Sequence, residues 1–510
     1  MLPQSQRKGD CKPCRESKAQ CDRKRPRCSE CISTSKACGG YDMGHIFINV
    51  NSARPPPLWN RTQNAQKYLV LDLASQPASP EQLQFPVIPS IEAVASPALP
   101  AFPNPDPTNL SGMVTVFLDL YYRRFGPDKT STDALQPGFE CGGWRSLLPS
   151  WVGQSPILDT AISALATCFV GTQYQQDRLM DYGRNMYLNA LQMLQQALAA
   201  SDSGNRRDLT ATTLVMSSTE LFMSNGGGPS QGAHIEGATR LLHCAFKWLD
   251  MEELHIYILH QGLFEAISTR RSYDFSSPSY RPLVRQLYTV PRTFPNDLYF
   301  RWCEIILPLP NILAAVDNIS SSSTPTPPPT ILTTLNEIVT LEQYLAPWYE
   351  TVKASMPGPW TLPAAQISAD SVPFPLHFMS IEVCTLYVLH WASQLLILEA
   401  RYVLSTHLPA HHGASASNST ATPQDLSAQM SEYASLICRS VQFCAHDTSF
   451  AATENIFFPL SVVACFYMRR GDDGRLKWCV AAFRRIAEEQ KIGYGSEKLE
   501  LAERRVGREA

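Results

Sequence analysis

Six cysteines near the N-terminus follow a repeated spacing, C-x2-C-x6-C-x6-C-x2-C-x6-C. They are Cys11, Cys14, Cys21, Cys28, Cys31 and Cys38. A C-x2-C pair brings two sulfurs close enough to chelate one tetrahedral ion, and thiolate is a soft ligand that suits Zn²⁺. Six thiolates can complete two four-coordinate ions only if two sulfurs bridge. Because so short a stretch cannot bury a hydrophobic core, the metal would take the place of that core.

Other uses of closely spaced cysteines fit the surrounding residues less well. A disulfide framework belongs to an oxidising compartment, but residues 1–10 are polar and show no apolar run of the kind found in a signal peptide. A metal-storage or redox peptide would not need the basic residues that surround these cysteines. We therefore favour a zinc cluster over the disulfide, storage and redox alternatives.

Charge is distributed unevenly along the chain. Residues 1–40 contain ten basic and four acidic side chains, a net charge of +6. The whole chain carries −3, which leaves −9 on residues 41–510. A basic head followed by an acidic body indicates a nucleic-acid-binding head.

The cysteine spacing resembles the fungal Zn₂Cys₆ binuclear zinc cluster of transcription regulators, over roughly residues 11 to 38. The resemblance implies two Zn²⁺ ions per chain, with the first and fourth cysteines, Cys11 and Cys28, bridging them. It also implies a short helix that enters the major groove of double-stranded DNA at a CGG-like triplet. Pro26 matches the loop proline of this family.

The expected DNA contacts surround the second and third cysteines. The segment 15–20 contains no glycine or proline and predicts a short helix. It keeps basic residues at Arg15 and Lys18, but Ser17 and Gln20 stand where the family usually has a basic residue. Lys18 is expected to contact a base edge, because lysine can donate to guanine O6 and N7. The remaining expected contacts, chiefly to phosphates, are Arg15, Arg23, Lys24, Arg25 and Arg27.

The run at 23–25 has two alternative interpretations. A solvated charged loop would show the same composition, and the run could equally serve nuclear import.

The sequence predicts that the chain is divided into four segments. Residues 1–10 form a basic tail, 11–40 the Zn₂Cys₆ domain, 41–110 a Pro-rich flexible linker, and 111–510 an all-helical body with disordered inserts near 318–330 and 409–425. The space between Cys38 and Pro55 is too short for coiled-coil heptads. A homodimer, if formed, is therefore expected through the helical body.

Apolar residues recur with helical period along the body. In the first helix they are Val114, Phe117, Leu118, Tyr121, Tyr122 and Phe125, and Ser155–Pro156 is a start signal for the second. The other predicted helices cover 182–200, 209–222, 231–242, 332–345, 381–404, 431–444, 457–469 and 475–490.

A second resemblance lies inside the body. His234, Gly237, Ala238, Leu241 and Leu242 are similar to the H-x-x-G-A-x-x-L-L motif of the fungal-specific transcription factor domain. Gly237 and Ala238 are expected to let neighbouring helices approach closely, and His234 is expected to be structural. The final helix, with Trp478, Val480, Phe483 and Ile486, also resembles the C-terminal portion of that family.

The combined expectation is a nuclear, sequence-specific transcription factor that regulates RNA polymerase II-type genes in a fungus and works with the transcription machinery. The alternative is an enzyme or ligand-carrier body with an appended metal-binding module. The body contains no G-x-S-x-G, G-x-x-x-x-G-K-[ST], H-E-x-x-H or G-x-G-x-x-G motif, so no catalytic residue is predicted and a non-enzyme is favoured. No membrane partner is expected, because the most hydrophobic run, 383–398, is interrupted by His390 and Gln394.

Overall fold

The computed structural model describes the chain in segments. These are residues 14, 17, 29–34, 106–122, 143–200, 206–223, 229–245, 252–292, 297–322, 326–361, 375–408, 422–445 and 449–492. The chain divides into two compact units, Met1–Glu81 and Gln82–Ala510.

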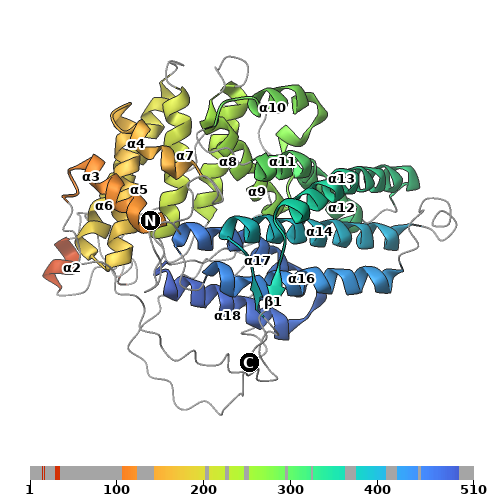
Figure 1. Ribbon diagram of the computed structural model, residues 1–510. Coiled ribbons are helices and arrows are strands. Elements are labelled where there is room, and N and C mark those ends of the chain that lie inside the picture. The colour runs from red at the N-terminus through yellow and green to blue at the C-terminus, as the bar shows by residue number, and fades with distance from the viewer. Residues whose placement is uncertain are drawn as a thin grey trace, which may run out of the picture. The chain divides into compact units, whose positions relative to one another are not determined.

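The second unit is largely helical, as predicted (Figure 1). Its first part contains α3 (Leu110–Tyr122), η2 (Trp144–Leu147), α4 (Leu148–Trp151), α5 (Pro156–Tyr174), α6 (Asp177–Ala199), α7 (Arg206–Met223), α8 (Pro229–Ala245) and α9 (Glu253–Thr269). The middle part contains η3 (Asp274–Ser276), η4 (Pro278–Tyr280), α10 (Arg281–Leu287), α11 (Asp297–Ile306), α12 (Leu309–Ser321) and α13 (Pro328–Ser355). The last part contains β1 (Trp360–Thr361), β2 (Leu376–His377), α14 (Ile381–His407), α16 (Pro423–Ala445), α17 (Phe450–Arg470) and α18 (Asp473–Glu489).

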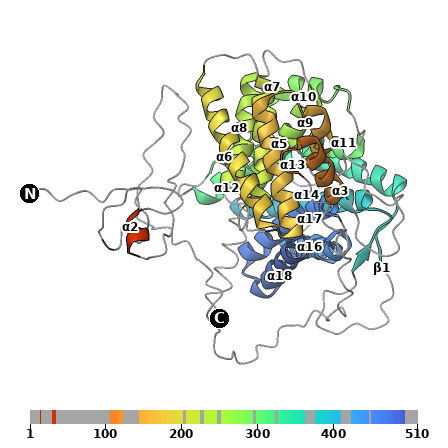
Figure 2. The same cartoon turned by 90° about the vertical axis from the view of Figure 1, so that its left-hand side faces the viewer.

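Helix α5 is the centre of the first part and packs against α3, α6 and α7. It starts as predicted, because the Ser155 hydroxyl accepts a hydrogen bond from the Leu158 N–H and Pro156 occupies the first turn. Figure 2 shows α5 running beside α6 and α7. Gly183 of α6 is the closest approach, since a Cβ added there would lie 2.5 Å from the Cys168 Sγ. The same Cβ would lie 3.0 Å from the Cys168 backbone nitrogen, so a larger side chain at this crossing would push the two helices apart.

Helix α7 is buried although its sequence is polar. Thr210, Thr212, Ser217 and Thr219 are each at most 4% exposed. The Thr219 hydroxyl donates to the Val215 carbonyl at 2.9 Å, and the Ser217 hydroxyl donates to the Leu214 carbonyl at 2.7 Å. Hydroxyls that return to their own helix in this way can be buried without a partner on another helix.

Helix α14 is the centre of the last part and packs against α12, α13, α16 and α17. It is buried on nearly every side over residues 381–400, which explains why its sequence is apolar all round. The neighbouring α13 instead buries one stripe of residues three or four apart. These are Ile331, Thr334, Ile338, Leu341, Leu345, Trp348 and Val352.

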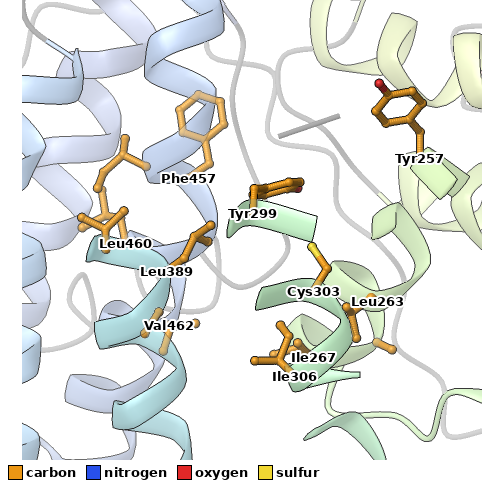
Figure 3. Packing of buried hydrophobic residues seen from close by; sticks show 14 of the residues in the cluster. Tyr257, Leu263, Ile267, Tyr299, Cys303, Ile306, Leu389, Phe457, Leu460 and Val462 are labelled. Atoms are coloured by element: carbon orange, nitrogen blue, oxygen red, sulfur yellow. The ribbon is translucent and has the colours of Figure 1, made fainter. Parts of the chain in front are cut away.

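The parts of the body share one core. Figure 3 shows Leu263 and Ile267 of α9 beside Cys303 and Ile306 of α11, with Leu389 of α14 near Leu460 of α17. Polar groups also join distant segments, because the Arg145 guanidinium donates to the Glu454 carboxylate at 3.0 Å and to the Ser218 hydroxyl at 2.6 Å. Arg145 is 1% exposed, so this ion pair lies within the core.

The structure corrects several boundaries. The insert expected near 318–330 is helical at both ends, since α12 continues to Ser321 and α13 begins at Pro328. The insert expected near 409–425 is shorter on its C-terminal side, because α16 begins at Pro423. Residues 323–325 and 409–421 lie outside the described part of the chain, as does Phe125.

Three helical segments are long and apolar enough to cross a membrane by length and composition: Asp297–Ser321, Ile381–His407 and Phe450–Arg470. In the structure 89% of the most apolar window of Ile381–His407 and 83% of that of Phe450–Arg470 are buried in the body. Packing inside the protein therefore accounts for the apolar character of these two helices. For Asp297–Ser321 the buried share is 56%.

Candidate metal centre and nucleic-acid interface

Two of the six predicted metal ligands, Cys14 and Cys31, belong to the described residues of the first unit. They come from different C-x2-C pairs, yet their Sγ atoms lie 3.9 Å apart. Both residues are buried, at 2% and 1% exposure. The fold of the head therefore gathers sulfurs from its two halves at one buried point.

The separation of these sulfurs fits a shared metal cluster. It is nearly twice the roughly 2.05 Å of a disulfide bond, so these atoms are not joined covalently. Two thiolates on one tetrahedral zinc at about 2.3 Å would lie about 3.8 Å apart. The donor set and its burial therefore fit Zn²⁺. The other four cysteines, Cys11, Cys21, Cys28 and Cys38, lie outside the described residues.

A short helix, α2 (Ser29–Ser33), positions Cys31. The Thr34 hydroxyl and the Ser33 hydroxyl both donate to the Glu30 carbonyl, at 2.7 and 3.0 Å, and close the end of the helix. Ile32 is 59% exposed while Cys31 beside it is buried. Cys14 also has helical backbone, so the second cysteine of each C-x2-C pair has the same local conformation. The near-symmetric spacing was a sequence signal for α2 that the helix prediction at 15–20 did not use.

The residues expected to contact DNA lie outside the described part of the head. They are Arg15, Lys18, Arg23, Lys24, Arg25 and Arg27. Within the predicted helix at 15–20 only Ser17 is described; it lies in a turn, and its hydroxyl donates to the Cys14 carbonyl at 3.5 Å. The DNA-contact assignments remain predictions.

His234, the first residue of the second motif, takes part in a polar cluster inside the body. The Tyr187 hydroxyl of α6 lies 2.8 Å from the His234 Nε2 and also donates to the Glu220 carboxylate of α7. Burial lowers the pKa of His234, against the opposing effect of the Glu220 charge. Burial is also the largest cause of the raised pKa of Tyr187, and Glu220 adds to it. His234 therefore joins α8 to α6 and α7, the structural role that was expected of it.

Of the motif residues after His234, some are packed in the core, whereas Gly237 has room for a larger side chain. Ala238 and Leu242 are 2% and 1% exposed, so they pack in the core. Gly237 does not meet the close-approach prediction, because a Cβ added there would meet Thr213 at an ordinary 3.7 Å. The sequence could not reveal Tyr187 and Glu220 as partners, since no local pattern links them to His234.

These features define the class of the protein: a small cysteine-ligated metal head with a basic surround, followed by a large helical body. Residues 10–43 match the family model of the fungal Zn(2)-Cys(6) binuclear cluster domain, a domain that binds two zinc ions. Residues 128–247 match the fungal specific transcription factor domain, and they include the His234 motif. The chain therefore contains two regions that are similar to domains of fungal transcription factors, a zinc-binding domain at the N-terminus and a transcription factor domain in the helical body.

Comparison with curated proteins and with solved structures found no match.

Proposed function

We propose that this protein is a nuclear, zinc-dependent transcription regulator that binds CGG-type triplets in double-stranded DNA and acts on genes of the RNA polymerase II type. The observation that carries the proposal is the convergence of Cys14 and Cys31, buried with sulfurs 3.9 Å apart inside the matched zinc-cluster region. The basic charge of residues 1–40 supports DNA as the partner.

In this proposal two zinc ions are held by Cys11, Cys14, Cys21, Cys28, Cys31 and Cys38. Cys11 and Cys28 are the bridging ligands, which follows from the resemblance of the spacing to the family. Zinc supplies the folding energy of the head, since so short a segment has little apolar surface to bury. Replacement of either bridging cysteine by alanine should abolish binding of both ions, whereas loss of a terminal ligand such as Cys21 should remove fewer thiolate–metal bonds.

The DNA contacts divide by type. Lys18 reads a base edge in the major groove, and Arg15, Arg23, Lys24, Arg25 and Arg27 hold the phosphate backbone. Phosphate contacts carry affinity without sequence information, so sequence preference depends mainly on Lys18.

In this proposal the helical body, residues 111–510, binds partner proteins. It forms the homodimer, meets the transcription machinery and is joined to the head by the linker at 41–110; it neither performs catalysis nor inserts into a membrane. One observation supports each of the last two points. The His234–Tyr187–Glu220 cluster is engaged in packing α6, α7 and α8, which favours a structural over a catalytic role. Two of the three membrane-length helical segments are more than four-fifths buried in the body, which argues against their insertion into a membrane.

The test uses the full-length chain. Bound zinc is measured by elemental analysis, and binding sites are selected from random duplex DNA with and without a zinc chelator. We expect two zinc ions per chain and an enriched CGG-type triplet that disappears with the chelator. Zinc without an enriched sequence, or sequence-specific binding that survives complete zinc removal, would contradict the proposal.

Localisation and the enzyme alternative need separate measurements. The protein fused to a fluorescent reporter should accumulate in the fungal nucleus, and Arg23→Ala/Lys24→Ala/Arg25→Ala tests whether that run also directs import. Turnover of a small-molecule substrate by the chain would favour the enzyme or carrier alternative.

A further inference from the structure

A second pair of thiols lies deep in the helical body. The Sγ atoms of Cys384 and Cys444 are 3.2 Å apart, although the residues are sixty positions apart in the sequence. Both residues are fully buried, with 0% of their surface exposed. The pair lies in the second unit, which does not contain the zinc-cluster cysteines.

The two cysteines meet at one end of a helical hairpin. Cys384 is in the first turn of α14, and Cys444 is in the last turn of α16. Because the two helices pack side by side (Figure 1), this contact makes them antiparallel. The chain connects them at the other end, between His407 and Pro423, so the thiols lie at the open end of the hairpin.

Local hydrogen bonds hold both backbones at this point. The Ser380 hydroxyl caps α14 by accepting from the Val383 N–H at 3.3 Å, and the Cys384 N–H donates to the Ser380 carbonyl at 3.1 Å. On the other side the Thr453 hydroxyl of α17 donates to the Cys444 carbonyl at 3.4 Å. Phe443, which precedes Cys444 in the chain, packs its ring against that of Phe378 with centroids 5.3 Å apart. The backbone beside each sulfur is thus held by hydrogen bonds of its own.

We propose that Cys384 and Cys444 are a modification site: a dithiol that peroxide converts to a disulfide joining α14 to α16. In the first step hydrogen peroxide transfers one oxygen to the Cys444 sulfur, which forms a sulfenic acid and releases one water. The Cys384 sulfur then attacks the Cys444 sulfur, the S–O bond breaks, and the leaving hydroxide takes the Cys384 proton as a second water. Two thiols are oxidised, one peroxide is reduced to two waters, and a thiol reductant reverses the change.

Burial sets the rate at which this site responds. Burial raises the pKa of the Cys384 thiol, so the reactive thiolate is scarce while the hairpin is closed. Cys444 is next to the last residue of its helix, and terminal turns open more readily than helix centres. Oxidation should therefore follow opening of this turn, which makes the site respond to sustained rather than brief exposure. Once formed, the cross-link closes the open end of the hairpin and restricts the unfolded chain.

The experiment treats the full-length, zinc-loaded chain with hydrogen peroxide below its unfolding temperature. Disulfide-linked peptides are then mapped by mass spectrometry without reduction. The thermal midpoint of the helical signal is followed in parallel for the original chain, Cys384→Ala and Cys444→Ala. Cys168→Ala is the matched control, because it removes a buried thiol from α5, a helix that packs against α6 and α7.

We expect a 384–444 linked peptide as the main disulfide within residues 82–510. It should form several-fold faster when the temperature is raised toward unfolding, and it should raise the thermal midpoint by several degrees. Both effects should be absent from Cys384→Ala and Cys444→Ala, return to baseline with dithiothreitol, and persist in Cys168→Ala. Peptide mapping of the unsubstituted chain decides the matter even if a variant fails to fold.

Two results would overturn the proposal. One is a body that keeps Cys384 and Cys444 as thiols after the zinc-cluster thiols have been oxidised. The other is preferential pairing of Cys438 with Cys479, a neighbouring thiol pair of α16 and α18 that is in hydrogen-bond contact.

Discussion

At the residue scale, Lys18 is expected to determine base preference. Its substitution, Lys18→Ala, removes the donor to guanine O6 and N7, so binding to the preferred triplet should weaken by about 1–3 kcal/mol while binding to unrelated DNA changes little. The measurement is a titration of the protein against a CGG-containing duplex and a scrambled duplex. Lys36→Ala, which changes the same charge between Cys31 and Cys38, is the matched control and should leave the preference intact.

Arg25 carries the same charge but is expected to contact phosphate. Arg25→Ala should weaken binding to every duplex by a similar factor, and it should reduce the slope of log Kobs against log salt by about 1. Titrations at several salt concentrations measure this slope. A loss confined to the CGG duplex would show that Arg25 reads a base instead.

His390 shows how a buried residue makes the stability of the body depend on pH. Its ring stacks on Tyr349 with centroids 3.6 Å apart and is 2% exposed. Burial, helped by the charge of Lys353, lowers its pKa to about 3. The unfolded chain therefore takes up the proton first. The contribution of His390 to stability is complete above about pH 6.5 and is lost as the pH falls toward 3.

We expect His390 to reduce the free energy of unfolding by about 2 kcal/mol between pH 7 and pH 5. His390→Phe keeps an aromatic ring for Tyr349 and should remove this part of the pH dependence. Denaturant unfolding at the two pH values measures the difference. The control His407→Phe changes an exposed histidine of the same helix. An unchanged pH dependence in His390→Phe would mean that other groups account for the acid sensitivity.

At the element scale, the ion pair of Arg145 and Glu454 joins η2 to α17 across 309 positions of sequence. Glu454→Ala removes the carboxylate partner of a guanidinium that is 1% exposed, so it should destabilise the body by about 3–5 kcal/mol. Asp181→Ala is the contrasting control, because its partner Arg184 is exposed and such pairs contribute about 1 kcal/mol or less. Thermal or denaturant unfolding compares the two variants; equal losses would contradict the buried-pair account.

Local sequence signals predicted several helices and one helix start. Helix α3 follows from the apolar periodicity of Val114, Phe117 and Tyr121, and the start of α5 follows from Ser155 and Pro156. Local composition misled the prediction near residues 318–330. Prolines and serines near 318–330 indicated an insert, yet Pro328 and Pro329 open α13, because proline is tolerated in a first helical turn.

Partnerships between elements were beyond prediction for a physical reason. His234 was recognisable from its motif, but Tyr187 and Glu220 are brought to it only by the packing of three helices. The contact of Cys384 with Cys444 likewise depends on the hairpin of α14 and α16. For the metal site, cysteine spacing predicts the whole set of six ligands, and that set stays a prediction. Among the described residues Cys14 and Cys31, which belong to different C-x2-C pairs, have their sulfurs 3.9 Å apart.

At the scale of the whole molecule, each of the two units is stabilised internally in a different way. The body has a large apolar core, whereas the head joins its halves through the buried thiols Cys14 and Cys31 and, as a domain of its family, binds two zinc ions. The units also differ in charge, since residues 1–40 carry +6 and the remainder −9. Stability and DNA binding should therefore respond to different treatments.

Zinc removal tests this separation directly. A chelator should abolish specific DNA binding, because the head loses the metal that organises its contacts. The helical circular dichroism and thermal midpoint of the body should stay nearly unchanged, because its core does not depend on metal-bound thiols. Both signals are measured on one sample before chelation, after chelation and after zinc is restored, and binding should return in the last step. A large loss of helical signal on chelation would mean that the body needs the zinc-loaded head in order to fold, and that the two units are energetically coupled.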